Sequence, residues 1–163
     1  MDKGERIDIE KFQGHRCFAC GTVNPIGLDL QFYRLGDFVC SDITLGKYHE
    51  GWENVAHGGL ISVLLDEVMS WTIIYFKKLF VVTRKMNLKY VRPVRTGIPL
   101  TVRGKLSAPL KYPKVGTRGE IRDGQGRLLV KSTGEFVELS EDDLSMVPDG
   151  VKEQRHSLLK TYG

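Results

Sequence analysis

The sequence predicts an α+β fold in which one antiparallel β-sheet, with the element order ββαββββ, wraps around a single long buried helix. Apolar and polar residues alternate in six short runs, and most connections between these runs are short. Between the second and third runs lies a stretch, residues 60–76, that lacks Gly and Pro and is apolar on nearly all sides. A helix without a polar face must be covered, so we expect the sheet to close over it.

Length and composition indicate one globular domain. The chain has 163 residues, of which 41% are hydrophobic and 27% charged, enough for a sizeable core. We divide it into a polar N-terminal segment (1–25), a single domain (26–139) and a polar C-terminal tail (140–163) with at most a short helix. The first residues lack the apolar stretch of a secretory signal, and acids interrupt the most apolar run. Because the three cysteines are an odd number, we expect reduced thiols and a cytoplasmic protein.

The first two strands are expected to form a hairpin. Apolar side chains alternate through residues 26–34, a turn is expected at Gly36-Asp37, and the alternation resumes over residues 38–45. Residues 46–56 are predicted to be a loop that leads into the helix.

Four more strands are expected after the helix, over residues 81–91, 99–106, 114–123 and 127–139. The turn at residues 123–126 joins the last two as a second hairpin. In the first of the four, one face is expected to carry Val82, Met86, Leu88 and Tyr90, and the other Thr83, Lys85, Asn87 and Lys89.

The predicted helix carries one polar stripe. Ser62, Asp66 and Ser70 recur at spacings of four residues, which places them on one side of a helix. The stripe therefore faces something polar, unless Asp66 is simply a buried carboxylate satisfied by backbone donors.

Four motifs together resemble the hotdog-fold acyl-CoA thioesterases, in particular the branch related to phenylacetyl-CoA thioesterase. They are CFACGTVNPIGLDLQF, HEGWENVAHGGLISVLLDE, TRKMNLKYVRPVRTG and GEIRDGQGRLLVKSTGEFVEL, within residues 17–139. The resemblance implies hydrolysis of an acyl-CoA thioester to a free acid and coenzyme A, with no cofactor because coenzyme A is part of the substrate. It also implies a homodimer, or a tetramer built as a dimer of dimers.

The helix start and the polar stripe supply the implied chemistry. Gly58 and Gly59 allow close approach of a ligand, and the unpaired N–H groups and dipole of the helix start would polarise the thioester carbonyl. Asp66 lies two turns further along, so the resemblance implies that the glycines of one subunit meet Asp66 of the other. Asp66 would act as nucleophile or general base.

The supporting residues each have an alternative. Thr83 would hold the water or the carboxylate by its hydroxyl, or is an ordinary strand residue. His57 would orient the loop or donate a hydrogen bond, although a structural role is favoured. Glu67 is the alternative catalytic carboxylate, but it lies off the stripe.

Substrate contacts are expected on both sides of the helix. Some members of the branch bind the thioester with an Asn or Gln six residues before the HGG histidine, where this chain has Gly51, so His49 or Asn54 would substitute. Residues 77–118 hold twelve Lys or Arg and no acid, a field that attracts phosphates. Candidates for the phosphates of coenzyme A are Arg84, Lys89, Arg92 and Arg95, and candidates for the acyl pocket are Trp52, Leu64, Val68 and Trp71.

Other functions are less well supported by the residues. Nucleic acid is not an expected partner, because exposed aromatics are not interleaved with the basic residues. His15, Cys17 and Cys20 suggest a zinc site but lack a fourth ligand, so no metal is expected and a loop packed beside the first strand is favoured. A non-catalytic acyl-CoA-binding hotdog module and a hotdog hydratase or dehydratase remain alternatives, and an intact Asp66 favours hydrolysis.

Overall fold

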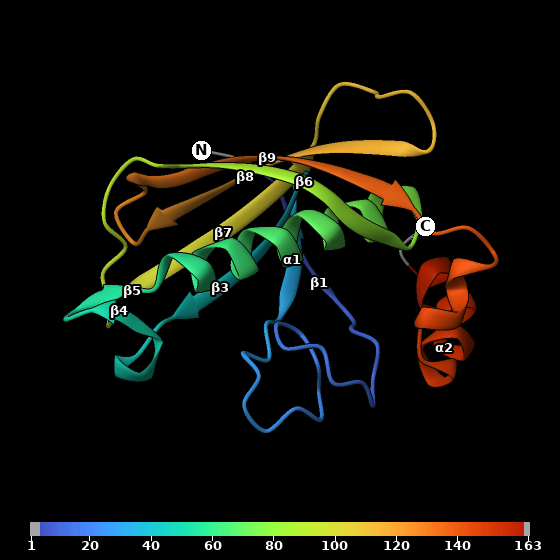
Figure 1. Ribbon diagram of the computed structural model, residues 1–163, viewed down its shortest axis with the longest axis horizontal. Helices are drawn as coiled ribbons and strands as arrows, with labels where there is room; N and C mark the ends of the chain where they lie inside the picture. Colours follow the sequence, from blue (N-terminus) through green and yellow to red (C-terminus); the bar gives the residue numbers. More distant parts are fainter. Residues whose placement is uncertain (1–3, 162–163) are drawn as a thin grey trace.

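The predicted architecture is confirmed by a computed structural model that describes residues 4–161. Seven antiparallel strands, in the order β1-β2-β3-β7-β8-β9-β6, curve over helix α1 (Figure 1). They are β1 (Arg6–Ile9), β2 (Phe32–Leu35), β3 (Phe38–Thr44), β6 (Val81–Tyr90), β7 (Pro99–Leu106), β8 (Lys114–Asp123) and β9 (Leu128–Glu138). The remaining elements are 3-10 turns η1 (Lys47–His49) and η2 (Asp143–Met146), strands β4 (Glu50–Trp52) and β5 (Val55–Ala56), and helices α1 (Gly58–Lys77) and α2 (Asp149–Thr161).

Helix α1 is the centre of the core. It begins after His57, which caps it, and ends at Lys78, whose left-handed φ of 60° stops the helix. By length and composition α1 could cross a membrane, but here its apolar residues pack beneath the sheet. The buried residues of α1 are Ile61, Leu64, Leu65, Val68, Met69, Trp71, Thr72, Ile73 and Tyr75.

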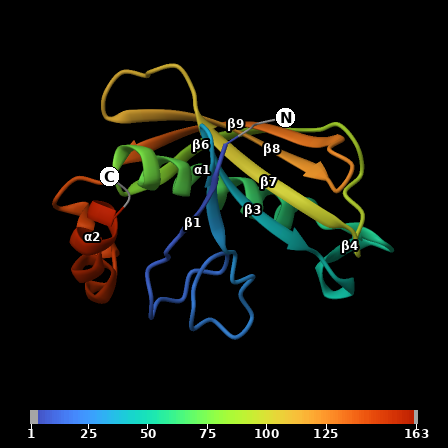
Figure 2. The same ribbon diagram turned by 180° about the vertical axis from the view of Figure 1, so that it is seen from behind.

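The N-terminal segment is part of the sheet, which the polar composition of residues 1–25 did not predict. Residues 6–9 pair with β2 as an edge strand, and Phe12 packs 5.5 Å from the Trp71 ring. Conversely, the strand expected over residues 26–34 begins only at Phe32. The residues before Phe32 form a loop (Figure 2). In this loop the Leu30 N–H donates to the carbonyl of the earlier residue Ala19 at 2.9 Å, so the apolar alternation there reflects loop packing.

Strand β6 is the other edge of the sheet and contains a β-bulge. The pairing with β9 shifts register between Thr83 and Lys85, so Arg84 is the additional residue. Thr83 therefore faces α1 together with Met86, Leu88 and Tyr90, and the expectation that Thr83 lies on the opposite face was wrong. The bulge changes the phase of the alternation, which no period-two pattern can anticipate.

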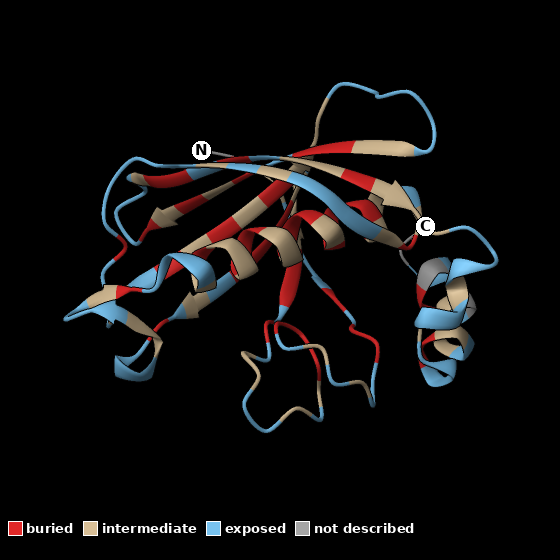
Figure 3. Ribbon diagram, viewed as in Figure 1, coloured by how far each residue is buried: buried red, intermediate tan, exposed pale blue. Residues whose placement is uncertain are grey.

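The C-terminal tail carries helix α2, which has 13 residues where at most a short helix was expected, and which is docked on the domain. Val151 and Leu158 are buried, and the Arg155 guanidinium lies 5.2 Å from the Phe80 ring. Figure 3 shows buried, intermediate and exposed residues together on α2. A further bond joins the Gln13 amide to Gln154 Oε1 at 2.7 Å. The two terminal regions thus contact each other beside the end of α1.

Candidate active site

The start of α1 is closed by a cap between His57 and Gly59. The Gly59 N–H donates to His57 Nδ1 at 2.9 Å, and a Cβ at Gly59 would lie 3.0 Å from that nitrogen, so glycine permits the cap. The Gly59 amide, expected to face the thioester, is therefore engaged in this structure. The Gly58 N–H has no partner among residues 4–161 and remains available as a donor.

Two hydroxyl groups donate to the Gly58 carbonyl in the first turn of α1, one from β6 and one from the helix itself. The Tyr90 hydroxyl donates to Gly58 O at 2.8 Å, and Ser62 Oγ donates to the same carbonyl at 3.2 Å. The sequence alone predicted only that Tyr90 lies on an apolar strand face, because its contact with Gly58 depends on the tertiary fold. Tyr90, Gly58, Ile61 and Arg92 line part of a cavity of about 290 Å³ at this helix start.

The polar stripe of α1 lies along β6. Thr83 Oγ1 donates to Asp66 Oδ1 at 2.6 Å, and Ser62 Oγ lies 3.4 Å from the Tyr90 hydroxyl. Burial raises the pKa of Asp66, an effect opposed by the Thr83 hydrogen bond, which favours the charged carboxylate. The structure thus places Asp66 and Thr83 together at the edge strand of the sheet.

Asp66 and the helix start do not form one site within a single chain. Eight residues separate Gly58 from Asp66, which is about 12 Å along a helix axis. A carbonyl bound at the Gly58 amide would therefore lie beyond reach of the Asp66 carboxylate of the same chain. The two features complement each other only if a second copy of α1 approaches across β6.

Glu67 faces a different part of the molecule. Trp71 Nε1 donates to Glu67 Oε1 at 3.0 Å, and Cys17 Sγ lies 3.6 Å from Glu67 Oε2. Burial raises the pKa of Glu67 to about 7, whereas a hydrogen bond from Cys20 lowers the pKa of Cys17 to about 5 and raises that of Cys20. Glu67 is thus turned toward the N-terminal loop and away from Thr83.

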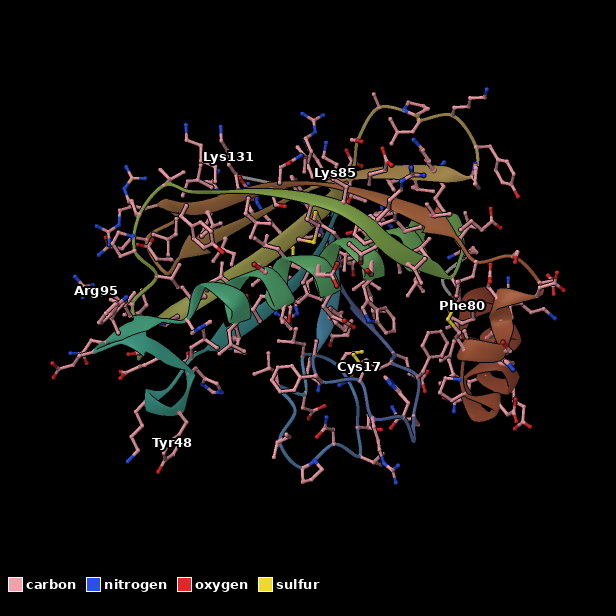
Figure 4. All side chains as sticks on the ribbon, in the orientation of Figure 1. Cys17, Tyr48, Phe80, Lys85, Arg95 and Lys131 are labelled. Atoms are coloured by element: carbon pink, nitrogen blue, oxygen red, sulfur yellow. The ribbon has the colours of Figure 1, made fainter. Side chains whose placement is uncertain are left out.

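The candidate phosphate-binding residues are divided between two faces. Arg84 pairs with Glu135 at 3.3 Å, and Lys89 lines a cavity of about 640 Å³ on the sheet face away from α1, where Lys131 also lies (Figure 4). Arg92 lines the cavity at the helix start and donates to Leu128 O at 2.6 Å. Arg95 pairs through its backbone with Val55, which lines the same cavity.

The proposed substitutes for the missing amide side chain are local structural residues. His49 Nδ1 accepts the Gly46 N–H at 2.9 Å and closes the η1 turn. Asn54 has a left-handed φ of 59° at the exposed turn between β4 and β5, where its N–H donates to Glu50 Oε1 at 3.0 Å. Among the described residues, no hydrogen bond joins the side chain of His49 or Asn54 to the cap formed by His57 and Gly59.

The expected acyl pocket is not formed by the four residues assigned to it. Leu64, Val68 and Trp71 are sealed in the core, with Trp71 stacked 4.7 Å from Phe32. Trp52 is 82% exposed at the β4–β5 hairpin. The apolar character of Leu64, Val68 and Trp71 predicted their burial correctly but could not distinguish a core from a binding cavity.

Comparisons with known proteins identify the family. The model of the thioesterase superfamily matches residues 53–108, which include the helix start, Asp66 and Thr83. A solved thioesterase superfamily protein is 30% identical, with a TM-score of 0.65, and the match covers 70% of this chain. The chain is a hotdog-fold protein of the thioesterase superfamily. It spans 56% of the length of that solved protein, and a search of curated proteins found no significant match.

Two further structures share the hotdog fold at lower identity. The PaaI protein of the phenylacetic acid degradation operon of E. coli is 18% identical with a TM-score of 0.62, and the match covers 69% of this chain and 81% of PaaI. A hypothetical thioesterase of Streptococcus pneumoniae TIGR4, solved with coenzyme A, is 19% identical with a TM-score of 0.61. The match covers 67% of this chain and 84% of the pneumococcal protein. The predicted superfamily and fold are thus confirmed.

Proposed function

We propose that the protein is an acyl-CoA thioesterase in which Asp66 drives hydrolysis. The observation that carries the proposal is the Asp66–Thr83 pair, a hydrogen-bonded carboxylate on the α1 face along the edge strand β6. A protein that only binds an uncharged thioester gains nothing from a partly buried carboxylate beside it. Membership of the thioesterase superfamily and the coenzyme A bound to the pneumococcal thioesterase support the substrate class.

The proposed active unit is a homodimer formed across β6. Within residues 4–161 no strand pairs with the outer edge of β6, and Val82 is 43% exposed and Tyr90 51%. An unpaired edge with exposed apolar side chains favours pairing with a second copy. Such pairing would bring the Gly58 amide of one protomer toward Asp66 of the other, and two of these dimers could associate as a tetramer.

The proposed reaction uses groups from both protomers. In one route, Asp66 accepts a proton from a water molecule as that water attacks the thioester carbon. In the other, the Asp66 carboxylate attacks the carbon itself, and water then hydrolyses the resulting acyl-enzyme anhydride. The Gly58 amide and the helix dipole stabilise the negative oxygen that develops, and one such donor typically contributes about 3 kcal/mol. The C–S bond then breaks and the leaving sulfur takes up a proton from the water, so the products are the free acid and the thiol of coenzyme A. No separate cofactor takes part.

Arg92 and Arg95 are the proposed contacts for the phosphates of coenzyme A. Both lie by the cavity at the helix start. If the thioester carbonyl binds the Gly58 amide, the nucleotide of the same coenzyme A would lie near this cavity. Arg84 and Lys89 are weaker candidates, because one is paired with Glu135 and the other lies over the opposite sheet face. The free cysteines fit the proposed cytoplasmic location.

The test is release of coenzyme A thiol from a panel of aryl and aliphatic acyl-CoAs. We expect Asp66→Asn to lose at least about a hundredfold in kcat while acyl-CoA binding is retained. Asp37→Asn, an exposed turn carboxylate, is the matched control and should keep full activity. Unchanged turnover in Asp66→Asn would disprove the assignment, and binding without turnover of any acyl-CoA by the wild type would instead favour the non-catalytic binding module.

A further inference from the structure

Two cysteines of the N-terminal loop and one glutamate of α1 converge at a place that the proposed reaction does not use. One ligand atom from each of Cys17, Cys20 and Glu67 lies within 4.8 Å of the other two. The two cysteines are separated by two residues, a spacing common in zinc sites. Glu67 comes from a helix far along the chain, so the cluster exists only in the folded protein.

The loop that carries the cysteines is shaped around the Cys17 sulfur. The Gly21 N–H donates to Cys17 O at 2.9 Å, and a Cβ at Gly21 would lie only 2.5 Å from that oxygen, so the turn needs glycine. The backbone amides of Ala19 and Cys20 contribute to lowering the pKa of Cys17. Such amides stabilise a thiolate, which is the form that binds a metal.

Glu67 is oriented toward the two sulfurs. The Trp71 indole holds Oε1 at 3.0 Å, which leaves Oε2 on the side of Cys17. No Lys, Arg or His among residues 4–161 forms an ion pair with Glu67. A partly buried carboxylate is normally paired with a cation or bound to a metal, and an orienting donor on the second oxygen is typical of carboxylate ligands.

We propose that Cys17, Cys20 and Glu67 bind one zinc ion, with a fourth position open to solvent. In a tetrahedral zinc site a thiolate sulfur and a carboxylate oxygen lie about 3.5 Å apart, and two sulfurs about 3.8 Å. Cys17 Sγ and Glu67 Oε2 are 3.6 Å apart, close to the tetrahedral value. The ligand atoms of all three residues lie within 4.8 Å of one another, so the Cys20 sulfur would have to move by about 1 Å at most. Thiolate ligands select zinc over magnesium or calcium.

His15 is not one of the proposed ligands, although its spacing to Cys17 suggested it. Its Nδ1 accepts the Cys17 N–H at 3.4 Å, and it is not part of the cluster of potential ligand atoms. The ion would join the loop of residues 17–20 to α1 at the residue after Asp66. The ion would lie outside the proposed hydrolysis, because Glu67 faces the loop and Asp66 faces Thr83.

The test measures metal binding and needs no activity. Protein purified with a reductant, with all three thiols confirmed as reduced, is stripped of metal and titrated with Co²⁺ and then Zn²⁺. We expect one ion per chain, the thiolate-to-cobalt absorption of a tetrahedral site, displacement of cobalt by zinc, and a higher Tm with zinc. The double variant C17S/C20S should lose binding, Glu67→Gln should weaken it at least about tenfold, and Cys40→Ser should behave as wild type.

Three results would overturn the proposal. The first is wild-type binding no tighter than that of C17S/C20S. The second is an unchanged cobalt spectrum and affinity in Glu67→Gln, which would remove the carboxylate from the ligand set. The third is equal loss of binding in Cys40→Ser, since Cys40 lies on β3 outside the cluster.

Discussion

The hydroxyl of Thr83 on β6 donates a 2.6 Å hydrogen bond to the carboxylate of Asp66 on α1. This contact depends on the bulge at Arg84, which turns Thr83 toward the helix. It fixes one carboxylate oxygen and leaves the other for water or substrate. The pair therefore couples the geometry of an edge strand to the orientation of the proposed catalytic group.

Removing the Thr83 hydroxyl should slow hydrolysis without unfolding the protein. Thr83→Val keeps the β-branched shape but loses the bond to Asp66, so we expect kcat to fall about 10- to 100-fold with little change in Tm. Thr83→Ser retains the hydroxyl and should keep most of the activity. The measurement is steady-state thiol release, and equal activity of the Val and Ser variants would show that the hydroxyl has no role.

The acidic limb of the pH profile should report the ionisation of Asp66. Burial raises the pKa of Asp66, and only the deprotonated carboxylate is active, so kcat/KM should fall as the pH drops through this raised pKa. The Thr83 hydrogen bond lowers the pKa, so its loss in Thr83→Val should move the limb to higher pH. A limb that moves to lower pH would contradict this assignment.

Replacing Gly58 by proline tests the helix-start donor directly. Proline is favoured at the first helical position and lacks only the N–H, and His57 before it is already extended with ψ 131°. We expect Gly58→Pro to lose about 100-fold or more in kcat while its far-ultraviolet circular dichroism is unchanged. Gly58→Ala keeps the amide, and its Cβ would lie 3.5 Å from the Tyr90 hydroxyl, so it should remain active.

Mixing two inactive variants tests whether the site is shared between protomers. Asp66→Asn and Gly58→Pro subunits, unfolded together and refolded, should form hybrid dimers in which one of the two composite sites is intact. With random assembly we expect about a quarter of wild-type activity to return, since half of the dimers are hybrids with one intact site of two. Refolding each variant alone is the control, and activity no higher than theirs would mean that each protomer works alone.

The oligomeric interface can be examined separately. Val82→Glu places a charge on the exposed edge of β6, so it should lower the sedimentation coefficient to that of a monomer and abolish activity together. Thr133→Glu adds the same single negative charge on the outer face of the sheet, beside Lys131, and it should leave both the assembly and turnover as in wild type. A fully active Val82→Glu monomer would contradict a site built from two copies.

Local pattern was sufficient to predict the main elements. The apolar stretch without Gly or Pro predicted α1, and the alternation over residues 38–45 and 99–106 predicted β3 and β7, because helix and strand periodicities are properties of neighbouring residues. The stripe of Ser62, Asp66 and Ser70 likewise predicted a polar helix side. The resemblance carried by the HGG motif and the downstream YVRPVRTG predicted the superfamily, which the comparisons confirmed.

Only the tertiary structure decided which of these side chains meet. A bulge turns Thr83 toward Asp66. His57 accepts a hydrogen bond from the Gly59 amide, and Glu67 approaches Cys17. Local periodicity does not encode any of these three contacts. The physical reason is that contacts across a sheet edge or between a loop and a helix depend on the packing of the whole domain, whereas periodicity reports only which side of an element is buried.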